Sequence, residues 1–91
     1  MSAIAMFVRI DGEHVTEGLR EALAMLDGAS KEAVLDFAAV SRVQPRDLAA
    51  LEELIKVADD RGIKIELRGV SVGIYKVLKL SRLTAPFGFH A

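Results

Sequence analysis

The chain has 91 residues, of which 52% are hydrophobic, and its 12 basic and 13 acidic residues give a net charge of -1. It has no basic stripe interleaved with aromatic residues, so it lacks the electrostatic footprint of a nucleic-acid-binding protein. The absence of cysteine excludes disulfides and thiol chemistry, and no apolar run approaches the ~18 residues of a membrane span. We therefore expect residues 1–91 to form one soluble cytoplasmic domain, with no nucleic-acid partner and no direct membrane insertion.

The first third of the sequence predicts a strand followed by a helix. Ile4 to Ile10 is apolar apart from Arg9, as expected for a buried strand. Thr16 is the expected N-cap of a helix from about Glu17 to Leu26, because its hydroxyl can accept a hydrogen bond from the first turn. Gly28 is the expected end of that helix.

The middle of the sequence predicts the central strand and the longest helix. Ala33 to Val40 is a short and almost wholly apolar run, which is typical of a parallel strand covered on both faces. Pro45 suits the first position of a helix from Pro45 to Arg61, because its missing N–H would have no intrahelical partner there. The Asp47 carboxylate in the first turn interacts favourably with the positive end of the helix dipole. Four apolar residues recur at helical spacing and are expected to form the buried stripe of this helix: Leu48, Leu51, Ile55 and Ala58.

The last third predicts a strand, a short helix and an apolar tail. Ile63 to Arg68 alternates apolar and charged residues, so we expect a strand nearer an edge of the sheet. Ser71 is the expected N-cap of a helix from Val72 to Leu80. Phe87 and Phe89 form either a small apolar patch or a segment folded over the sheet edge. The fold class is α/β: a single small domain with a mostly parallel β-sheet and flanking helices.

Few residues suggest chemistry. His14 and His90 have no partner at metal-ligand spacing, so we expect no metal and no cofactor. Asp36 is either a functional carboxylate or a strand-end aspartate that accepts backbone hydrogen bonds. Arg42 and Arg46 flank Gln44 and form either a recognition surface for a carboxylate or carbonyl group, or a solvated loop. We expect no catalytic residue.

One segment carries a family resemblance. VLDFAAVSRVQPRDLAAL, a helix and then RGIKIELRGVS resemble the STAS domain, the fold of bacterial anti-sigma factor antagonists. In that family a strand of the type V-x-L-D-L-s-G-V runs into an Asp-Ser-(Ser/Thr)-Gly-Leu turn that caps the next helix. Asp36 matches the strand aspartate, Val40 the valine, Leu48 the leucine after the glycine, and Arg61-Gly62 the segment before the next strand. The resemblance therefore implies a STAS-like fold.

The chain departs from the family at the turn itself. Gln44 and Pro45 stand where the family has Asp-Ser, so the serine that partner kinases phosphorylate is replaced by a residue without a hydroxyl. Ser41 and Ser71 lie near the turn, but neither occupies the phosphorylated position. We expect no phosphorylation switch at this site, and a partner that presents an acidic or carbonyl-rich patch beside Arg46.

The resemblance implies a non-enzymatic protein–protein interaction module. Its partner would be an anti-sigma factor of the serine-kinase type or a transporter ATPase, and a homodimer is left open. The alternatives are a STAS subunit of an ABC-type membrane transport complex, and a small-molecule or lipid binder that uses a pocket between the sheet and the last helix. The residues expected to bind a partner lie in the loop and the next turn: Ser41, Arg42, Gln44, Pro45, Arg46, Asp47, Ser71 and Tyr75.

Overall fold

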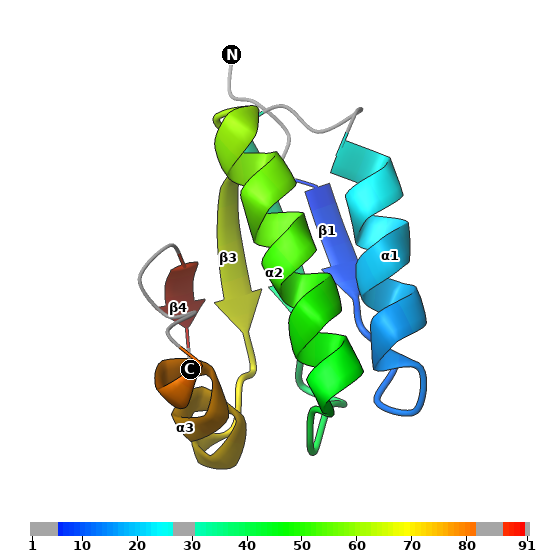
Figure 1. Ribbon diagram of the computed structural model, residues 1–91, viewed down its shortest axis with the longest axis vertical. Coiled ribbons are helices and arrows are strands. Elements are labelled where there is room, and N and C mark those ends of the chain that lie inside the picture. The colour runs from blue at the N-terminus through cyan, green and yellow to red at the C-terminus, as the bar shows by residue number, and fades with distance from the viewer. Residues whose placement is uncertain (1–5, 27–30, 82–86, 91) are drawn as a thin grey trace.

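The computed structural model describes residues 6–26, 31–81 and 87–90. Strands and helices alternate along the chain (Figure 1). In order they are β1 (Met6–Arg9), α1 (Val15–Met25), β2 (Glu32–Asp36), α2 (Pro45–Asp60), β3 (Lys64–Arg68), α3 (Val72–Leu80) and β4 (Phe87–His90). The expected α/β class is confirmed. Gly28, expected to end the first helix, and the first two residues of the expected strand Ile4 to Ile10 lie outside the described residues.

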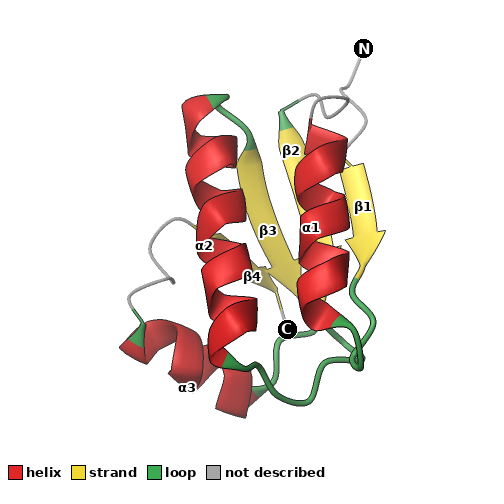
Figure 2. Ribbon diagram, turned by 45° about the vertical axis from the view of Figure 1, so that its right-hand side comes forward, coloured by secondary structure: helices red, strands yellow, loops and turns green. Residues whose placement is uncertain are grey.

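The strands form one parallel sheet in the order β1-β2-β3-β4. Each pair of neighbours is consecutive and parallel, so every connection is a crossover that contains one helix. Helices α1 and α2 lie side by side over one face of the sheet (Figures 1 and 2). The interior position predicted for the central strand is confirmed, since β2 lies between β1 and β3.

The expectation that β3 lies nearer an edge than the central strand is wrong, because β2 and β3 are both interior strands. Phe87–His90 pairs with β3 on the side away from β2, so the segment that contains the two C-terminal phenylalanines is itself the edge strand, β4. The alternation in Ile63 to Arg68 has a different cause. Ile65 and Leu67 belong to the hydrophobic core, whereas Lys64 and Arg68 are exposed. The alternation therefore arises because one face of the sheet is apolar and the other is largely polar, and it does not indicate an unpaired edge.

The sheet has one apolar and one largely polar face. Val8, Leu35 and Leu67 are opposite one another on neighbouring strands, and all three are in the hydrophobic core. The next row, on the other face, consists of Arg9, Asp36 and Arg68. The Arg9 Nε lies 3.7 Å from the Asp36 Oδ2. The preceding row on this face is mixed: Phe7 is 53% exposed, whereas Val34 and Glu66 are buried.

Strand β2 is shorter than the predicted run from Ala33 to Val40 because the chain turns after Asp36. The Asp36 Oδ1 accepts a hydrogen bond from the Ala38 N–H at 2.9 Å, and the Val40 N–H donates to the Phe37 carbonyl at 2.9 Å. An aspartate side chain that binds the backbone two residues ahead favours a turn over a strand. Asp36 is therefore a strand-end aspartate that accepts a backbone hydrogen bond, the second of the two roles considered for it.

The helix boundaries differ at one important point. Helix α1 begins at Val15, and its N-cap is His14, whose side chain makes no capping hydrogen bond. The predicted capping role of Thr16 is wrong, because Thr16 lies inside the helix, is buried and donates its hydroxyl to Asp47. The start of α2 at Pro45 and the Ser71 cap of α3 are confirmed. Gly62 follows α2 with φ +68°, a conformation that glycine adopts at little steric cost.

None of the helices in the described part of the chain combines the length and the apolar character needed to cross a bilayer.

Candidate functional site

The loops after β1 and β2 enclose a pocket of about 290 Å³ at the carboxyl ends of the strands. Both loops lead directly into a helix, so the first turns of α1 and α2 border the pocket. In parallel α/β sheets ligands bind outside the carboxyl ends of the strands, where the loops that follow neighbouring strands meet. The pocket is lined by Gly12, Glu13, Val15, Ser41, Arg42, Gln44, Arg46 and Asp47.

The start of α2 is held by one buried carboxylate. Asp47 is 5% exposed, and its Oδ2 accepts a hydrogen bond from the Gln44 backbone N–H at 2.8 Å. Its Oδ1 accepts a bond from the Thr16 hydroxyl of α1 at 2.5 Å. The first contact is half of a capping box, and the second joins two helices across 31 residues of sequence. Both carboxylate oxygens are therefore engaged, so Asp47 fixes the shape of the loop.

Next to the buried Asp47, the loop between β2 and α2 exposes polar side chains to solvent. Ser41, Arg42, Gln44, Pro45 and Arg46 are all exposed. Within the described residues, neither Arg42 nor Arg46 forms an ion pair or a side-chain hydrogen bond. Two guanidinium groups beside a helix N-terminus favour binding of an anionic or carbonyl group. Both guanidinium charges and the N-terminal end of the helix dipole are positive.

Two glycines let the loops approach one another closely. A Cβ atom at Gly12 would lie 2.1 Å from the Ala39 carbonyl oxygen, so only glycine fits at this position of the β1–α1 loop. At Gly69, where φ is +70°, a Cβ atom would lie 2.9 Å from the Ala38 nitrogen. The loops after β1 and β3 therefore both pack against the turn after β2. The surface next to α3 is continuous with the loop that leads into α2.

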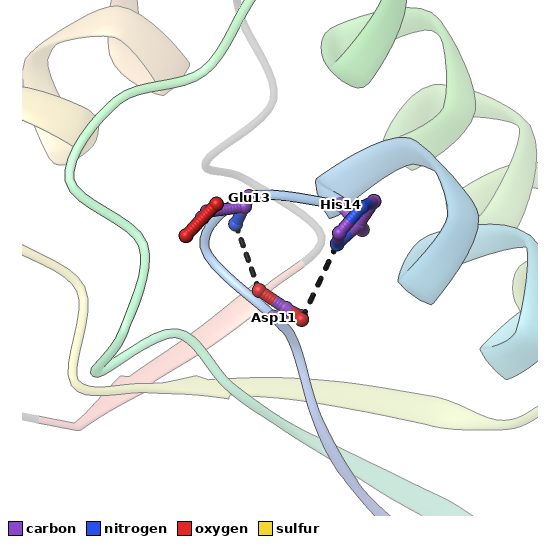
Figure 3. Close-up of polar contacts among 3 residues, drawn as sticks. All are labelled: Asp11, Glu13 and His14. Carbon is purple, nitrogen blue, oxygen red and sulfur yellow. Dashed lines mark hydrogen bonds and ion pairs between the residues drawn. The ribbon is translucent and has the colours of Figure 1, made fainter.

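The β1–α1 loop has its own polar cluster (Figure 3). The Asp11 Oδ1 accepts a hydrogen bond from the Glu13 N–H at 2.8 Å, and the His14 Nδ1 lies 3.3 Å from the Asp11 Oδ2. The Glu13 N–H, followed by the His14 ring, holds the pKa of Asp11 below its ordinary value of 3.8. All three residues are exposed, and the bond from the Glu13 N–H ties the Asp11 side chain to the backbone of the loop.

The structure brings together part of the residue set predicted to bind a partner. Ser41, Arg42, Gln44, Arg46 and Asp47 line the pocket. Ser71 and Tyr75 lie instead on α3, where the Ser71 Oγ accepts a hydrogen bond from the Ile74 N–H at 3.2 Å. Pro45 is exposed at the first position of α2. The set therefore covers the pocket rim and the start of α3.

Sequence reasoning missed the contribution of the β1–α1 loop. Gly12, Glu13 and Val15 line the pocket, and Thr16 supplies the buried hydroxyl. The signal was available in the topology, because neighbouring parallel strands bring their following loops to the same edge of the sheet. Among the described residues, no three histidine, aspartate or glutamate side chains gather as a metal site would require.

Comparison with known proteins identifies the fold. No protein-family profile and no curated sequence matches the chain. Among solved structures, a sulfate transporter family protein from Wolinella succinogenes is similar with a TM-score of 0.79 and 22% identity, over 93% of this chain and 75% of that one. The phosphorylated form of the Bacillus cell fate determinant SpoIIAA is similar with a TM-score of 0.62 and 16% identity, over 96% of this chain and 79% of that one. The resemblance in sequence and the likeness in structure agree: this chain has the STAS-like fold of SpoIIAA.

Proposed function

We propose that this domain is a non-enzymatic module that binds a partner protein through the loop after β2 and the first turn of α2, as an anti-sigma factor antagonist does. The observation that carries the proposal is the pair of exposed guanidinium groups, Arg42 and Arg46, on a loop that the buried Asp47 holds in place. A preformed surface loses little conformational entropy on binding. The partner would present acidic side chains or carbonyl groups to the two arginines.

Binding at this surface is constitutive in our proposal. The similar Bacillus protein was solved in its phosphorylated form. In this chain the matching turn is Gln44-Pro45, which offers no hydroxyl. A phosphate at such a position would add nearly two negative charges to a helix N-terminus and change what the surface attracts. Pro45 prevents that change and gives α2 a preorganised start.

The two parts of the proposal have separate tests. For binding, the Arg42→Glu/Arg46→Glu variant is compared with Arg20→Glu, which changes an exposed arginine on α1. The probes are a purified anti-sigma factor kinase and a purified transporter ATPase. We expect one of them to bind the wild type and the Arg20 variant in isothermal titration calorimetry and to lose affinity for the loop variant. Binding that the loop variant leaves intact would contradict the proposal.

For constitutive binding, the protein is incubated with the same kinase and ATP, and its intact mass is measured. We expect no phosphate adduct on the wild type, because Pro45 has no oxygen to accept the phosphate. The Gln44→Asp/Pro45→Ser variant restores the family motif and should gain one. A stoichiometric adduct on Ser41 or Ser71 of the wild type that abolishes binding would overturn this part alone.

A second candidate is a subunit of an ABC-type membrane transport complex. It is favoured by the likeness to a sulfate transporter family protein, whose TM-score of 0.79 exceeds that of the SpoIIAA structure. The choice of calorimetric probe separates the two candidates, because a transporter ATPase and an anti-sigma factor kinase are tested side by side. The small-molecule alternative placed its pocket between the sheet and the last helix, whereas the pocket described above lies between the loops after β1 and β2.

A further inference from the structure

Helix α3 exposes large apolar side chains on its outward face. Ile74 and Leu78 point into the core, at 2% and 0% exposure. Val72 and Leu80 are 72% and 86% exposed, and Tyr75 is 40% exposed. At 3.6 residues per turn, Val72 lies on the side of α3 away from the core, with Tyr75 and Leu80 on either side of it, about 140° apart around the helix axis.

Two lysines share this face. Lys76 and Lys79 follow Val72 by four and seven positions and are exposed. No aspartate or glutamate occurs anywhere in the sequence after Glu66. The exposed side of α2 is different, since it carries Glu52, Glu53, Asp59 and Asp60 with Lys56 as its lysine. The outward face of α3, formed by Val72, Tyr75, Lys76, Lys79 and Leu80, is therefore apolar and basic. Below it is called the α3 face.

We propose that the α3 face docks an acidic amphipathic helix of a partner protein. The apolar side chains of that helix would pack on Val72, Tyr75 and Leu80. Its carboxylates would pair with Lys76 and Lys79, which lie between these three side chains. Recognition of a helix by apolar contacts combined with charges of the opposite sign is a common mode of binding. The apolar contacts would supply most of the affinity, and the charges would select the partner.

Charge decides against the two other occupants. A second copy that met the α3 face through a two-fold axis would bring lysines against lysines, because such an interface pairs the same patch with itself. An anionic membrane would be attracted by two lysines only weakly, and three apolar side chains on a nine-residue helix bury little in lipid. An acidic protein helix meets both the apolar and the basic part of the α3 face.

The location of the α3 face supports a shared partner. The α2 N-terminus and α3 lie at the same end of the molecule (Figures 1 and 2). The loop before α3 packs against the turn after β2, at Gly69 and Ala38. A partner held by Arg42 and Arg46 can therefore extend over the α3 face. This inference rests on the proposed function in that the occupant is a protein, but it has its own readout.

The experiment uses the full chain, labelled with ¹⁵N, and two synthetic peptides. Both are helical peptides with leucines at spacings of three and four, flanked by glutamates in one and by lysines in the other. We expect the glutamate peptide to shift the amide signals of α3 and the lysine peptide to leave them unchanged. In the Lys76→Glu/Lys79→Glu variant the preference should reverse, with affinity for the glutamate peptide reduced about tenfold or more. Lys56→Glu, on α2, is the matched control and should bind as the wild type does.

The remaining outcomes overturn the inference. Equal binding of both peptides, or shifts confined to other elements, would show that the α3 face has no preference for an acidic helix. Co-sedimentation with phosphatidylserine vesicles that the double lysine variant abolishes would assign the face to a membrane. A dimer in analytical ultracentrifugation that the same variant dissociates would assign it to a second copy. If a kinase or ATPase binds through Arg42 and Arg46 but ignores Lys76 and Lys79, the proposed function stands and this inference fails.

Discussion

The junctions that follow β2 and β3 occupy equivalent places in the fold, but they are stabilised differently. At the first, α2 begins at a proline and is fixed by the buried Asp47, which also binds Thr16 of α1. At the second, α3 is capped by the Ser71 hydroxyl, and its next residue, Val72, is 72% exposed. At the first junction the Asp47 side chain is bound within the fold, and Arg42 and Arg46 remain exposed for a partner. The second leaves apolar surface uncovered.

The largest expected effect comes from the buried stripe of α2. Leu51 is 1% exposed, so Leu51→Ala should lower the free energy of unfolding by on the order of 2 to 5 kcal/mol through lost transfer energy and a cavity. Leu80→Ala on α3 is the matched control. Because Leu80 is 86% exposed, its truncation should change stability by less than about 0.5 kcal/mol. Chemical denaturation of both variants measures the difference. Equal effects would mean that Leu51 and Leu80 do not differ in burial as described.

The second prediction concerns the buried link between α1 and α2. Asp47→Ala removes the acceptor of the Gln44 N–H, and loss of such a cap costs about 1 kcal/mol. It also leaves the buried Thr16 hydroxyl without its partner, which costs a further ~1 to 3 kcal/mol. Asp59→Ala, at an exposed position near the end of the same helix, should be nearly neutral.

A double-mutant cycle with Thr16→Val isolates the pair. We expect a coupling free energy above about 0.5 kcal/mol, because the two side chains are in direct contact. Additive effects of the two substitutions would show that the hydrogen bond between the helices does not contribute to stability.

The third prediction tests the weaker junction. Ser71→Ala removes the side-chain cap of α3 and should cost about 1 kcal/mol. This is less than the cost of Asp47→Ala, because one hydrogen bond is lost, the one donated by the Ile74 N–H, and not two. Hydrogen exchange of the α3 amides should accelerate more than that of α2. If Ser71→Ala destabilised the protein more than Asp47→Ala, the ranking of the two junctions would be reversed.

The sequence predicted those features of both junctions that depend on neighbouring residues. Pro45 at a helix start and Ser71 as a cap follow from local backbone chemistry, and both are confirmed. The role of Thr16 was predicted wrongly because a residue suited to capping has the same hydroxyl as a residue that binds a distant carboxylate. Only the fold brings Thr16 within reach of Asp47.

The same reason explains the error at the sheet edge. An alternating strand such as Ile63 to Arg68 has the same pattern whether it lies at an edge or beside a polar face, and the pairing with Phe87–His90 is not encoded locally. The pocket shows which residues of the candidate site could be predicted from the sequence and which could not. Arg42, Gln44 and Arg46 were predicted from the turn itself, whereas Gly12 and Glu13 join them through the order of the strands.

The smallest expected effect lies in the β1–α1 loop, which borders the first junction but carries no buried link of its own. Hydrogen bonding from the Glu13 N–H, followed by the His14 ring, lowers the pKa of Asp11, so the folded state favours the ionised carboxylate. Its contribution to stability is then complete above pH 3.8 and is lost as the pH falls through the lowered pKa. The side chain is 65% exposed, so solvent screens the interaction and the effect on stability should be slight.

Titration of the Asp11 carboxyl carbon by NMR should give a midpoint below pH 3.8. His14→Ala should raise that midpoint only part of the way, because the bond from the Glu13 N–H is the larger cause and remains. A midpoint at or above 3.8 in the wild type would mean that the turn does not persist in solution and that the pocket rim is not preformed on that side.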